Sequence, residues 1–309
     1  FLYFIGELIP SHIFIVYSCN GDMRKAATTL LLADVSSKQF EILMIKRHSK
    51  ARFMANNFVF PGGCLEESDP IAVHSMGNLI QADPLAAFRV GALRELFEET
   101  GVSVDEKGEV GTGPHDFVAT EKGVSSLTPF AHWITPKQEK YRYDTWFFAK
   151  MASCDFPSTA VLRHDREVTE LRWVSPSDAI AMHEREHDAS FRLPPPTYLI
   201  LKDLATFKSA QEVIDCHESI VAVSREAAAK QGLPWSPMDA FPEIEPVLEI
   251  ANGVVSRMYM REASWVPETV APYPTADKNS PRVAHFPVFT PNGLMKHAAV
   301  HIGGPCPFR

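Results

Sequence analysis

Apolar runs separated by turn-forming residues occupy the first part of the chain, in a pattern typical of strands. Ala26–Ala33 and Phe40–Ile45 are rich in Leu, Ile and Thr, and the polar segment Asp34–Lys38 between them predicts a hairpin turn. A shorter run, Phe58–Phe60, leads into Pro61-Gly62-Gly63, where the chain must turn. Three strands are therefore expected in this part of the chain.

A long helix is predicted after these strands. Asp83 can cap its start, Pro84 suits the first helical position, and Gly101 suits the cap at its end. Apolar residues between these ends recur at helical spacing, which predicts one buried face formed by Leu85, Phe88, Ala92 and Leu96. Together these signals define a helix of about 17 residues.

Extended and helical segments alternate in the following part of the chain. Three further strands are expected at Phe130–Thr135, Asp144–Lys150 and Leu171–Val174. A helix is expected to open at about Ser177, and Pro194-Pro195-Pro196 marks a boundary. Beyond it, Tyr198–Val223 is predicted to be mostly helical, and the remainder to Arg309 is rich in proline. The pattern predicts an α/β fold followed by a mainly helical and Pro-rich C-terminal extension.

Composition limits the classes of partner. With 309 residues, of which 45% are hydrophobic, the chain has enough apolar material for a sizeable core. A formal net charge of −8 argues against a general binder of nucleic acid or of anionic membranes, because such proteins carry a basic excess. A small molecule that carries phosphate groups needs only a local basic pocket, so this class of ligand stays open.

Cysteine usage and the first residues bear on the compartment. Five cysteines without a CxxC pair suggest neither a disulfide framework nor a zinc knuckle, which fits a reducing, intracellular compartment. Residues 1–22 include an apolar stretch, but it contains Glu7 and Pro10 and lacks a basic leader, so no transmembrane segment is predicted. We expect residues 1–22 to be an N-terminal extension outside the fold.

The predicted helix carries the densest chemistry of the sequence. Glu95, Glu98 and Glu99 stand at positions i, i+3 and i+4, so their carboxylates converge within roughly 100° of one helix face. An acidic cluster is often only a solvated surface. Here Glu99 projects close to the apolar row and Arg94 lies one turn before Glu98, as an orienting partner would. Oxygen ligands of this kind suit Mg²⁺ or Mn²⁺.

The segment Arg94-Glu95-Leu96-Phe97-Glu98-Glu99-Thr100-Gly101-Val102 resembles the second half of the Nudix box, Gly-x5-Glu-x7-Arg-Glu-U-x-Glu-Glu-x-Gly-U, where U is aliphatic. Gly63 matches the start of the box, and Asp69 stands where the family has Glu. Between Asp69 and Arg94 lie 24 residues where the family has seven, an insertion of 17 at about residues 70–86. A box split in this way is similar to the peroxisomal coenzyme A diphosphatase branch.

A second motif lies just upstream. Arg47 and Arg52 precede the glycine pair at a spacing similar to the signature of coenzyme A-cleaving Nudix enzymes, which has Gly where this chain has Asn56. Asn tolerates left-handed backbone better than most residues, so the departure is mild. Two arginines there could hold phosphate groups by bidentate contacts. Taken alone, they would equally be surface arginines at a strand end.

The resemblance implies a fold and a site. It implies a Nudix-type α/β/α sandwich with a mixed sheet over residues 23–193, followed by the extension at 194–309. Carried over to this chain, the metal ligands are Glu95, Glu98, Glu99 and the carbonyl of Gly63. Arg94 then holds a glutamate in position, and the substrate is bound by Arg47, Arg52, Gly62 and Gly63. A further acidic residue would act as ligand or base; Glu167, Glu170 and Asp144 are candidates, with Glu167 favoured.

Aromatic and histidine residues outside these motifs are interpreted as structural rather than functional. Aromatic side chains at strand spacing could stack on an adenine but more often fill a core, which is our interpretation for Trp133, Trp146, Phe147 and Phe148. His183 and His187 stand at the helical i, i+4 spacing of a zinc site, but the sequence offers no evident third ligand. We therefore expect surface positions for His132, His164, His183 and His187.

Three functional hypotheses remain open at this point. The first is metal-dependent hydrolysis of coenzyme A or acyl-coenzyme A to 3′,5′-ADP and (acyl-)4′-phosphopantetheine. The second is Nudix hydrolysis of ADP-ribose, a dinucleoside polyphosphate or a nucleotide sugar, and the third is a non-catalytic Nudix binding module. The resemblance implies a peroxisomal location, although the last four residues, Cys306-Pro307-Phe308-Arg309, are not a peroxisomal signal of the Ser-Lys-Leu type. The sequence leaves the oligomeric state open.

Overall fold

The structure is a computed structural model. It describes residues 23–36, 39–51, 54–112, 116–136, 141–152, 167–185 and 190–241, together with the backbone of 243–251, 254–262, 283–289 and 295–301. Residues 1–22, His164, His187 and Arg52 lie outside the described residues.

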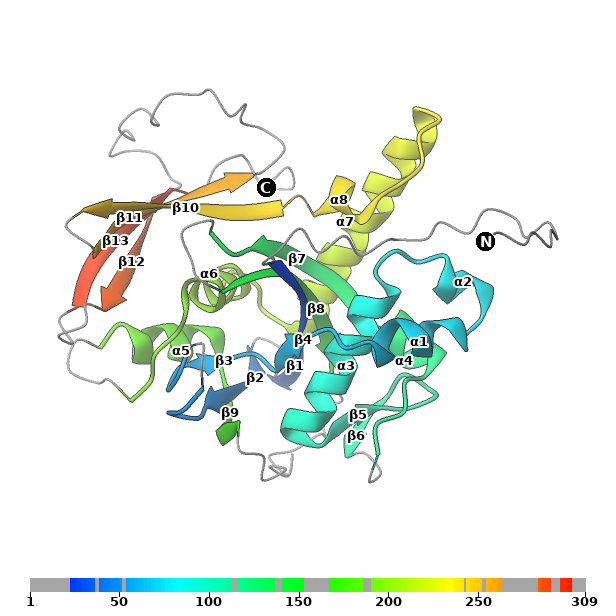
Figure 1. The fold of residues 1–309 in the computed structure, drawn as a ribbon, viewed down its shortest axis with the longest axis horizontal. Coiled ribbons are helices and arrows are strands. Elements are labelled where there is room, and N and C mark those ends of the chain that lie inside the picture. Colours follow the sequence, from blue (N-terminus) through cyan, green and yellow to red (C-terminus); the bar gives the residue numbers. More distant parts are fainter. Residues whose placement is uncertain are drawn as a thin grey trace, which may run out of the picture.

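A mixed sheet forms the centre of the protein (Figure 1). Its strands in the first 174 residues are β1 (Met23–Ser36), β2 (Gln39–Arg47), β3 (Phe58–Val59), β4 (Gly62–Cys64), β7 (Thr128–Ile134), β8 (Arg142–Met151) and β9 (Val168–Val174). β1 pairs parallel with β8 and antiparallel with β2 and β4, and β7 pairs antiparallel with β8. A separate antiparallel pair is formed by β5 (Val102–Val104) and β6 (Val110–Thr112). The pairing of β1 with β2 confirms the predicted hairpin.

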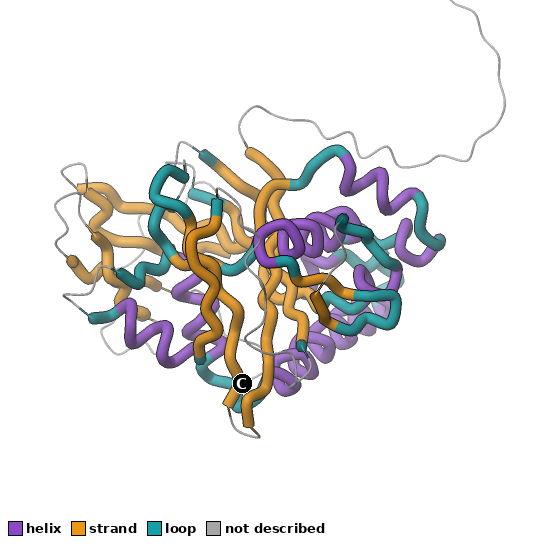
Figure 2. Tube along the Cα trace, turned by 90° about the horizontal axis from the view of Figure 1, so that it is seen from below, coloured by secondary structure: helices purple, strands orange, loops and turns teal. Residues whose placement is uncertain are grey.

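Helices cover both faces of the sheet (Figure 2). They are α1 (Ser68–His74), α2 (Asn78–Gln81), α3 (Ala86–Thr100), α4 (Glu121–Ser125), α5 (Pro176–His183), α6 (Pro195–Leu204), α7 (Ala210–Lys230) and α8 (Pro237–Ala240). Successive residues of a strand point to opposite faces. Accordingly, Trp146 and Phe148 of β8 pack with residues of α3, whereas Phe147 and Ala149 pack with residues of α5 and α6. The four predicted core aromatic residues, Trp133, Trp146, Phe147 and Phe148, are all buried, as expected.

The central helix starts later than predicted. α3 begins at Ala86 with Leu85 as its N-cap residue, so the prediction of a start at Asp83 and Pro84 was wrong. The Asp83 carboxylate accepts a hydrogen bond from the Leu85 amide at 3.0 Å and lies 3.5 Å from Arg89, which closes a turn ahead of the helix. The end is as predicted, because Gly101 adopts a left-handed φ of 74°.

The predicted insertion at about residues 70–86 contains helical structure of its own. α1 and α2 fall largely within it, and α1 packs against α3. The insertion therefore lies beside the helix that carries the three glutamates, rather than away from the site.

The C-terminal extension is helical only in its first part. Helices α6 and α7 agree with the prediction that Tyr198–Val223 is mostly helical. They are followed by the short helix α8 and by four strands that were not predicted: β10 (Glu243–Ala251), β11 (Val254–Glu262), β12 (Val283–Phe289) and β13 (Met295–His301). β10 joins the main sheet by pairing parallel with β7, where Glu243 lies opposite His132. No helix in the described ranges is both long and apolar enough to span a membrane.

Two histidines expected at the surface are buried, so that prediction was wrong for them. His132 is 3% exposed, stacks on Trp146 and shares a hydrogen bond of 2.6 Å between its Nε2 and the Asp144 carboxylate. His183 is 0% exposed, and its Nδ1 accepts a hydrogen bond from the Leu193 amide. Burial lowers the pKa of His183 to about 4, so its neutral form is favoured in the folded protein.

Candidate active site

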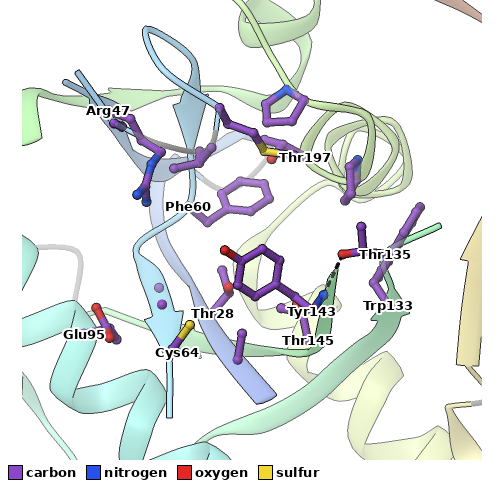
Figure 3. A pocket seen from close by; sticks show the side chains of 18 of the residues that line it. Thr28, Arg47, Phe60, Cys64, Glu95, Trp133, Thr135, Tyr143, Thr145 and Thr197 are labelled. Atoms are coloured by element: carbon purple, nitrogen blue, oxygen red, sulfur yellow. Dashed lines mark hydrogen bonds between the residues drawn. The ribbon is translucent and has the colours of Figure 1, made fainter. Parts of the chain in front are cut away.

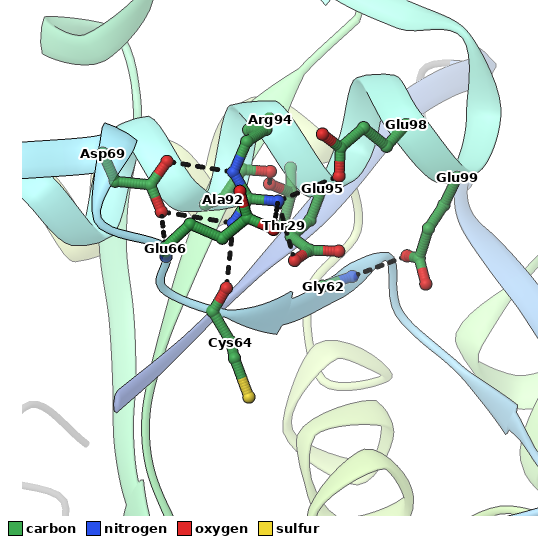
Figure 4. Close-up of polar contacts among 10 residues, drawn as sticks. All are labelled: Thr29, Gly62, Cys64, Glu66, Asp69, Ala92, Arg94, Glu95, Glu98 and Glu99. Carbon is green, nitrogen blue, oxygen red and sulfur yellow. Dashed lines mark hydrogen bonds and ion pairs between the residues drawn. The ribbon is translucent and has the colours of Figure 1, made fainter. Parts of the chain in front are cut away.

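Helix α3 presents its three glutamates to different surroundings. Glu99 is 4% exposed and accepts a hydrogen bond of 2.9 Å from the Gly62 amide. The side chain of Glu95 is 16% exposed, whereas that of Glu98 is 45% exposed. The helix therefore places Glu95 and Glu99 inward and leaves Glu98 at the rim of the site (Figure 4).

Arg94 connects two glutamates of α3 with the backbone of β4 through hydrogen bonds. Its Nη1 donates to Glu95 at 3.0 Å and to Glu98 at 2.9 Å, and its Nη2 donates to the carbonyl of Cys64 at 2.8 Å. Burial alone would lower the pKa of Arg94, but its hydrogen bonds to Asp69 and the charges of the neighbouring carboxylates raise it. The structure thus joins Arg94 by hydrogen bonds to two glutamates rather than to one, and a third, Glu66, lies 3.9 Å from its Nη1.

Asp69 is the buried partner of Arg94. Its side chain is 0% exposed and accepts from Arg94 Nε at 3.0 Å and Nη2 at 3.2 Å, and also from the Glu66 amide at 2.8 Å. Sequence reasoning assigned no role to Asp69, although its place in the box was a usable signal. The shorter Asp side chain still reaches Arg94, because Gly91 of α3 lets the helix approach: a Cβ there would lie 3.0 Å from the Asp69 carboxylate.

The backbone of β4 lies close to Glu95 at Gly63. A Cβ added at Gly63 would lie 2.5 Å from the Glu95 carboxylate, closer than non-bonded atoms can approach. A larger residue at this position would therefore displace the Glu95 side chain. The arrangement brings together Gly63, Glu95 and Glu99, three of the residues that the resemblance implied for the site.

The two inward carboxylates lack enough compensating charge to favour their ionised forms. Burial raises the pKa of Glu95 to about 7; Arg94 opposes this rise, while Glu98 and Glu167 add to it. Burial and then the charge of Glu95 also raise the pKa of Glu99 well above its ordinary value. A divalent cation beside these oxygens would stabilise both ionised carboxylates.

The residues fit Mg²⁺ or Mn²⁺ by their oxygen ligands and by this charge imbalance. Within the described ranges, however, no three His, Cys, Asp or Glu side chains converge closely enough to form a ready metal site. The guanidinium of Arg94 contacts both Glu95 and Glu98. Of the four residues that the resemblance implies as ligands, Glu95, Glu99 and Gly63 lie together, whereas Glu98 is the most exposed of the three glutamates.

The raised pKa of Glu95 predicts a pH-dependent stability of the metal-free protein. Between the ordinary value of 4.5 and about 7, the unfolded chain releases this proton while the folded protein keeps it. Stability should therefore fall as pH rises through this window, by up to about 3 kcal/mol relative to Glu95→Gln. Urea unfolding in EDTA at several pH values measures the effect, and identical pH profiles for the two proteins would contradict it.

A cavity of about 970 Å³ opens beside these carboxylates (Figure 3). Its described lining includes the predicted Arg47, Gly62, Gly63, Glu95, Glu99 and Glu167, but not Arg94 or Glu98. Asn56 has a φ of 59°, so it adopts the left-handed backbone expected where the similar signature has Gly. Arg52, the second arginine of that motif, lies outside the described residues.

Of the three candidate acidic residues, only Glu167 lines the cavity. Asp144 is held by His132, and Glu170 pairs with Arg172. Both carboxylates therefore have partners that direct them elsewhere, which favours Glu167 among the three.

Several lining residues were missed by sequence reasoning. Arg24, His48, Lys50 and Tyr143 line the cavity, and Trp133 does so in addition to packing in the core. For Arg24 and Tyr143 the signal is strand parity, because they are paired across β1 and β8. That register was not available from the sequence, because it depends on a parallel pairing between distant segments.

Comparisons with a family model and with curated proteins point to the same family, and comparison with solved structures points to the same fold. Residues 23–193 match the family model described as NUDIX domain. The acyl-coenzyme A diphosphatase NUDT19 of Xenopus laevis is 26% identical, over 66% of this chain and 68% of that protein. Its counterpart in Gallus gallus is 24% identical, over 62% and 70%. The crystal structure of a NUDIX hydrolase from Alicyclobacillus acidocaldarius has a TM-score of 0.50 and 23% identity, covering 63% of this chain and 97% of that one, which confirms the predicted fold.

Proposed function

Because the chain belongs to the Nudix hydrolase family, we propose that it hydrolyses the diphosphate bond of coenzyme A or acyl-coenzyme A with the aid of Mg²⁺ or Mn²⁺. The products would be 3′,5′-ADP and (acyl-)4′-phosphopantetheine. The similarity to two acyl-coenzyme A diphosphatases supports this substrate class. The split box, which resembles the peroxisomal branch, supports a peroxisomal location.

One observation carries the proposal: buried carboxylates, a cationic side chain and an apolar wall share one cavity. Glu95 and Glu99 line it together with Arg47 and with apolar residues such as Phe60 and Phe147. Its volume of about 970 Å³ lies near the upper end of the range for small-molecule sites, which leaves space beyond a diphosphate group.

Each residue of the site has a distinct role in the proposed reaction. Glu95, Glu98, Glu99 and the Gly63 carbonyl would hold the ion, which when bound neutralises charge on the diphosphate and lowers the pKa of a bound water. The Gly62 amide orients Glu99, and Arg94 orients Glu95. Glu167 would accept the proton of the attacking water, and Arg47 would hold a phosphate group of the substrate.

A metal-supplemented substrate panel tests the proposal. Purified protein is incubated with Mg²⁺ or Mn²⁺ and with coenzyme A, an acyl-coenzyme A, ADP-ribose, a dinucleoside polyphosphate or a nucleotide sugar, and the products are resolved by chromatography. We expect 3′,5′-ADP from the first two substrates and none when EDTA is present. Preferential cleavage of another member of the panel would replace coenzyme A by that substrate class.

Replacing Arg47 by alanine should lower kcat/KM for coenzyme A by roughly ten- to a hundredfold, because it removes a charge-assisted contact to a phosphate. If Arg47 binds the 3′-phosphate, dephospho-coenzyme A, which lacks this group, should be affected much less. Arg225→Ala is a matched control, since Arg225 stacks on Trp235 outside the cavity. Equal losses on both substrates would place Arg47 at the diphosphate, and no loss on either would remove it from the site.

A further inference from the structure

One row of side chains crosses four neighbouring strands on the floor of the cavity. Ala26 of β1 lies opposite Cys64 of β4 and also opposite Thr145 of β8, and Thr145 lies opposite Trp133 of β7. All four residues line the cavity. The row covers three strand spacings of about 4.8 Å, so it extends roughly 14 Å from the glycine pair.

The chemistry of the lining changes along this row. Glu95 lies beside β4, and Arg47, His48 and Lys50 line the cavity at the end of β2. Over β8 and β7, the described lining is uncharged and consists of aromatic, aliphatic, proline and threonine side chains. Among the described residues, two cations lie near that part: Arg24, an exposed residue of β1 that lines the cavity and is paired with Tyr143, and Arg142 of β8, which donates to the Thr135 carbonyl at 3.1 Å but does not itself line the cavity. Figure 3 shows Glu95 and Arg47 on one side of the cavity and Trp133 on the other.

We propose that the substrate lies across the strands, with its phosphorylated nucleoside toward Arg47 and its uncharged, amide-bearing arm over Thr145 and Trp133. This orientation rests on the proposed function and extends it by assigning each half of coenzyme A to one side of the site. Thr145 and Trp133 would then contact this arm and determine the specificity for it.

The charge of the substrate favours this orientation over the reverse one, in which the nucleoside half would lie over β8 and β7. The nucleoside half of coenzyme A carries the 3′-phosphate. At Thr145 and Trp133 this dianion would be removed from water against an uncharged lining, whereas Arg47, His48 and Lys50 line the other side of the cavity. The arm is neutral, so the same surface costs it little. Its amides can bond with the hydroxyl groups of Thr135, Thr145 and Thr197, which line this side of the cavity.

Separate binding of the two products, 4′-phosphopantetheine and 3′,5′-ADP, tests which side of the cavity binds which half of the substrate. Thr145→Leu adds bulk to the floor without changing charge, and Trp133→Phe alters the neighbouring position of the same row while keeping it apolar. Binding of 4′-phosphopantetheine and of 3′,5′-ADP is measured by calorimetry with Mg²⁺ for wild type and both variants. Thr112→Leu is the matched control, because Thr112 is exposed at the end of β6 and lies outside the cavity. Thermal unfolding verifies that each variant is folded.

We expect Thr145→Leu to weaken 4′-phosphopantetheine binding at least about tenfold and to leave 3′,5′-ADP binding unchanged. Trp133→Phe should act in the same direction, and Arg47→Ala should show the reverse preference. Weakened 3′,5′-ADP with unchanged 4′-phosphopantetheine would overturn the orientation, as would no effect of Thr145→Leu or Trp133→Phe in an enzyme that cleaves coenzyme A. A wild-type protein that does not cleave coenzyme A would overturn the proposed function itself.

Discussion

Replacing Glu99 by glutamine is expected to lower kcat at least about 100-fold while the protein stays folded. Glu99 lines the cavity and is oriented by the Gly62 amide, so the neutral isostere removes charge from the proposed metal site without changing volume. Folding should not suffer, because burial already disfavours the ionised carboxylate. Steady-state kinetics with coenzyme A and thermal unfolding measure the two effects, and near-wild-type turnover would remove Glu99 from the metal site.

Two further variants sharpen this result. Glu98→Gln is also expected to lower kcat at least about 100-fold if Glu98 binds the ion, whereas a contact with Arg94 alone would give a smaller loss. Glu98 does not line the cavity, so the comparison with Glu99→Gln separates these roles. Glu218→Gln is the matched control, because Glu218 is an exposed residue of α7.

Replacing Arg94 by methionine is expected to lower the free energy of unfolding by about 3–5 kcal/mol, because it leaves the carboxylate of Asp69 buried without its partner. Asp69 is 0% exposed, and Arg94 supplies two of the three hydrogen bonds that it accepts. Activity should fall as well, since Arg94 also holds Glu95. Urea unfolding of the variant and wild type measures the stability change.

A double-mutant cycle tests whether the loss comes from the unpaired charge. Adding Asp69→Asn to Arg94→Met replaces the buried carboxylate by a neutral amide, so part of the lost stability should return. Strictly additive losses would contradict the assignment of Asp69 as the partner that Arg94 neutralises.

The sequence by itself determined the elements whose signals are local. The spacing of Glu95 and Glu99 on one helix, the cap at Gly101 and the hairpin of β1 with β2 depend on residues that are neighbours along the chain. The left-handed backbone at Asn56 is a property of a single residue. Helical spacing and cap preferences act over one or two turns, which is why these features could be predicted. The start of α3 was placed too early, because Asp83 and Pro84 suit a turn as well as a helix.

Only the tertiary structure decided the features that depend on distant pairings. Asp69 meets Arg94 across an insertion, and the row from Cys64 to Trp133 exists only in one register of four strands. The burial of His132 follows from its stacking on Trp146, a residue of the neighbouring strand. A shift of one residue in any strand turns each side chain to the opposite face, and no local pattern encodes that register. The helix therefore carries the residues that the sequence could identify, while the register of the sheet decides which side chains line the cavity.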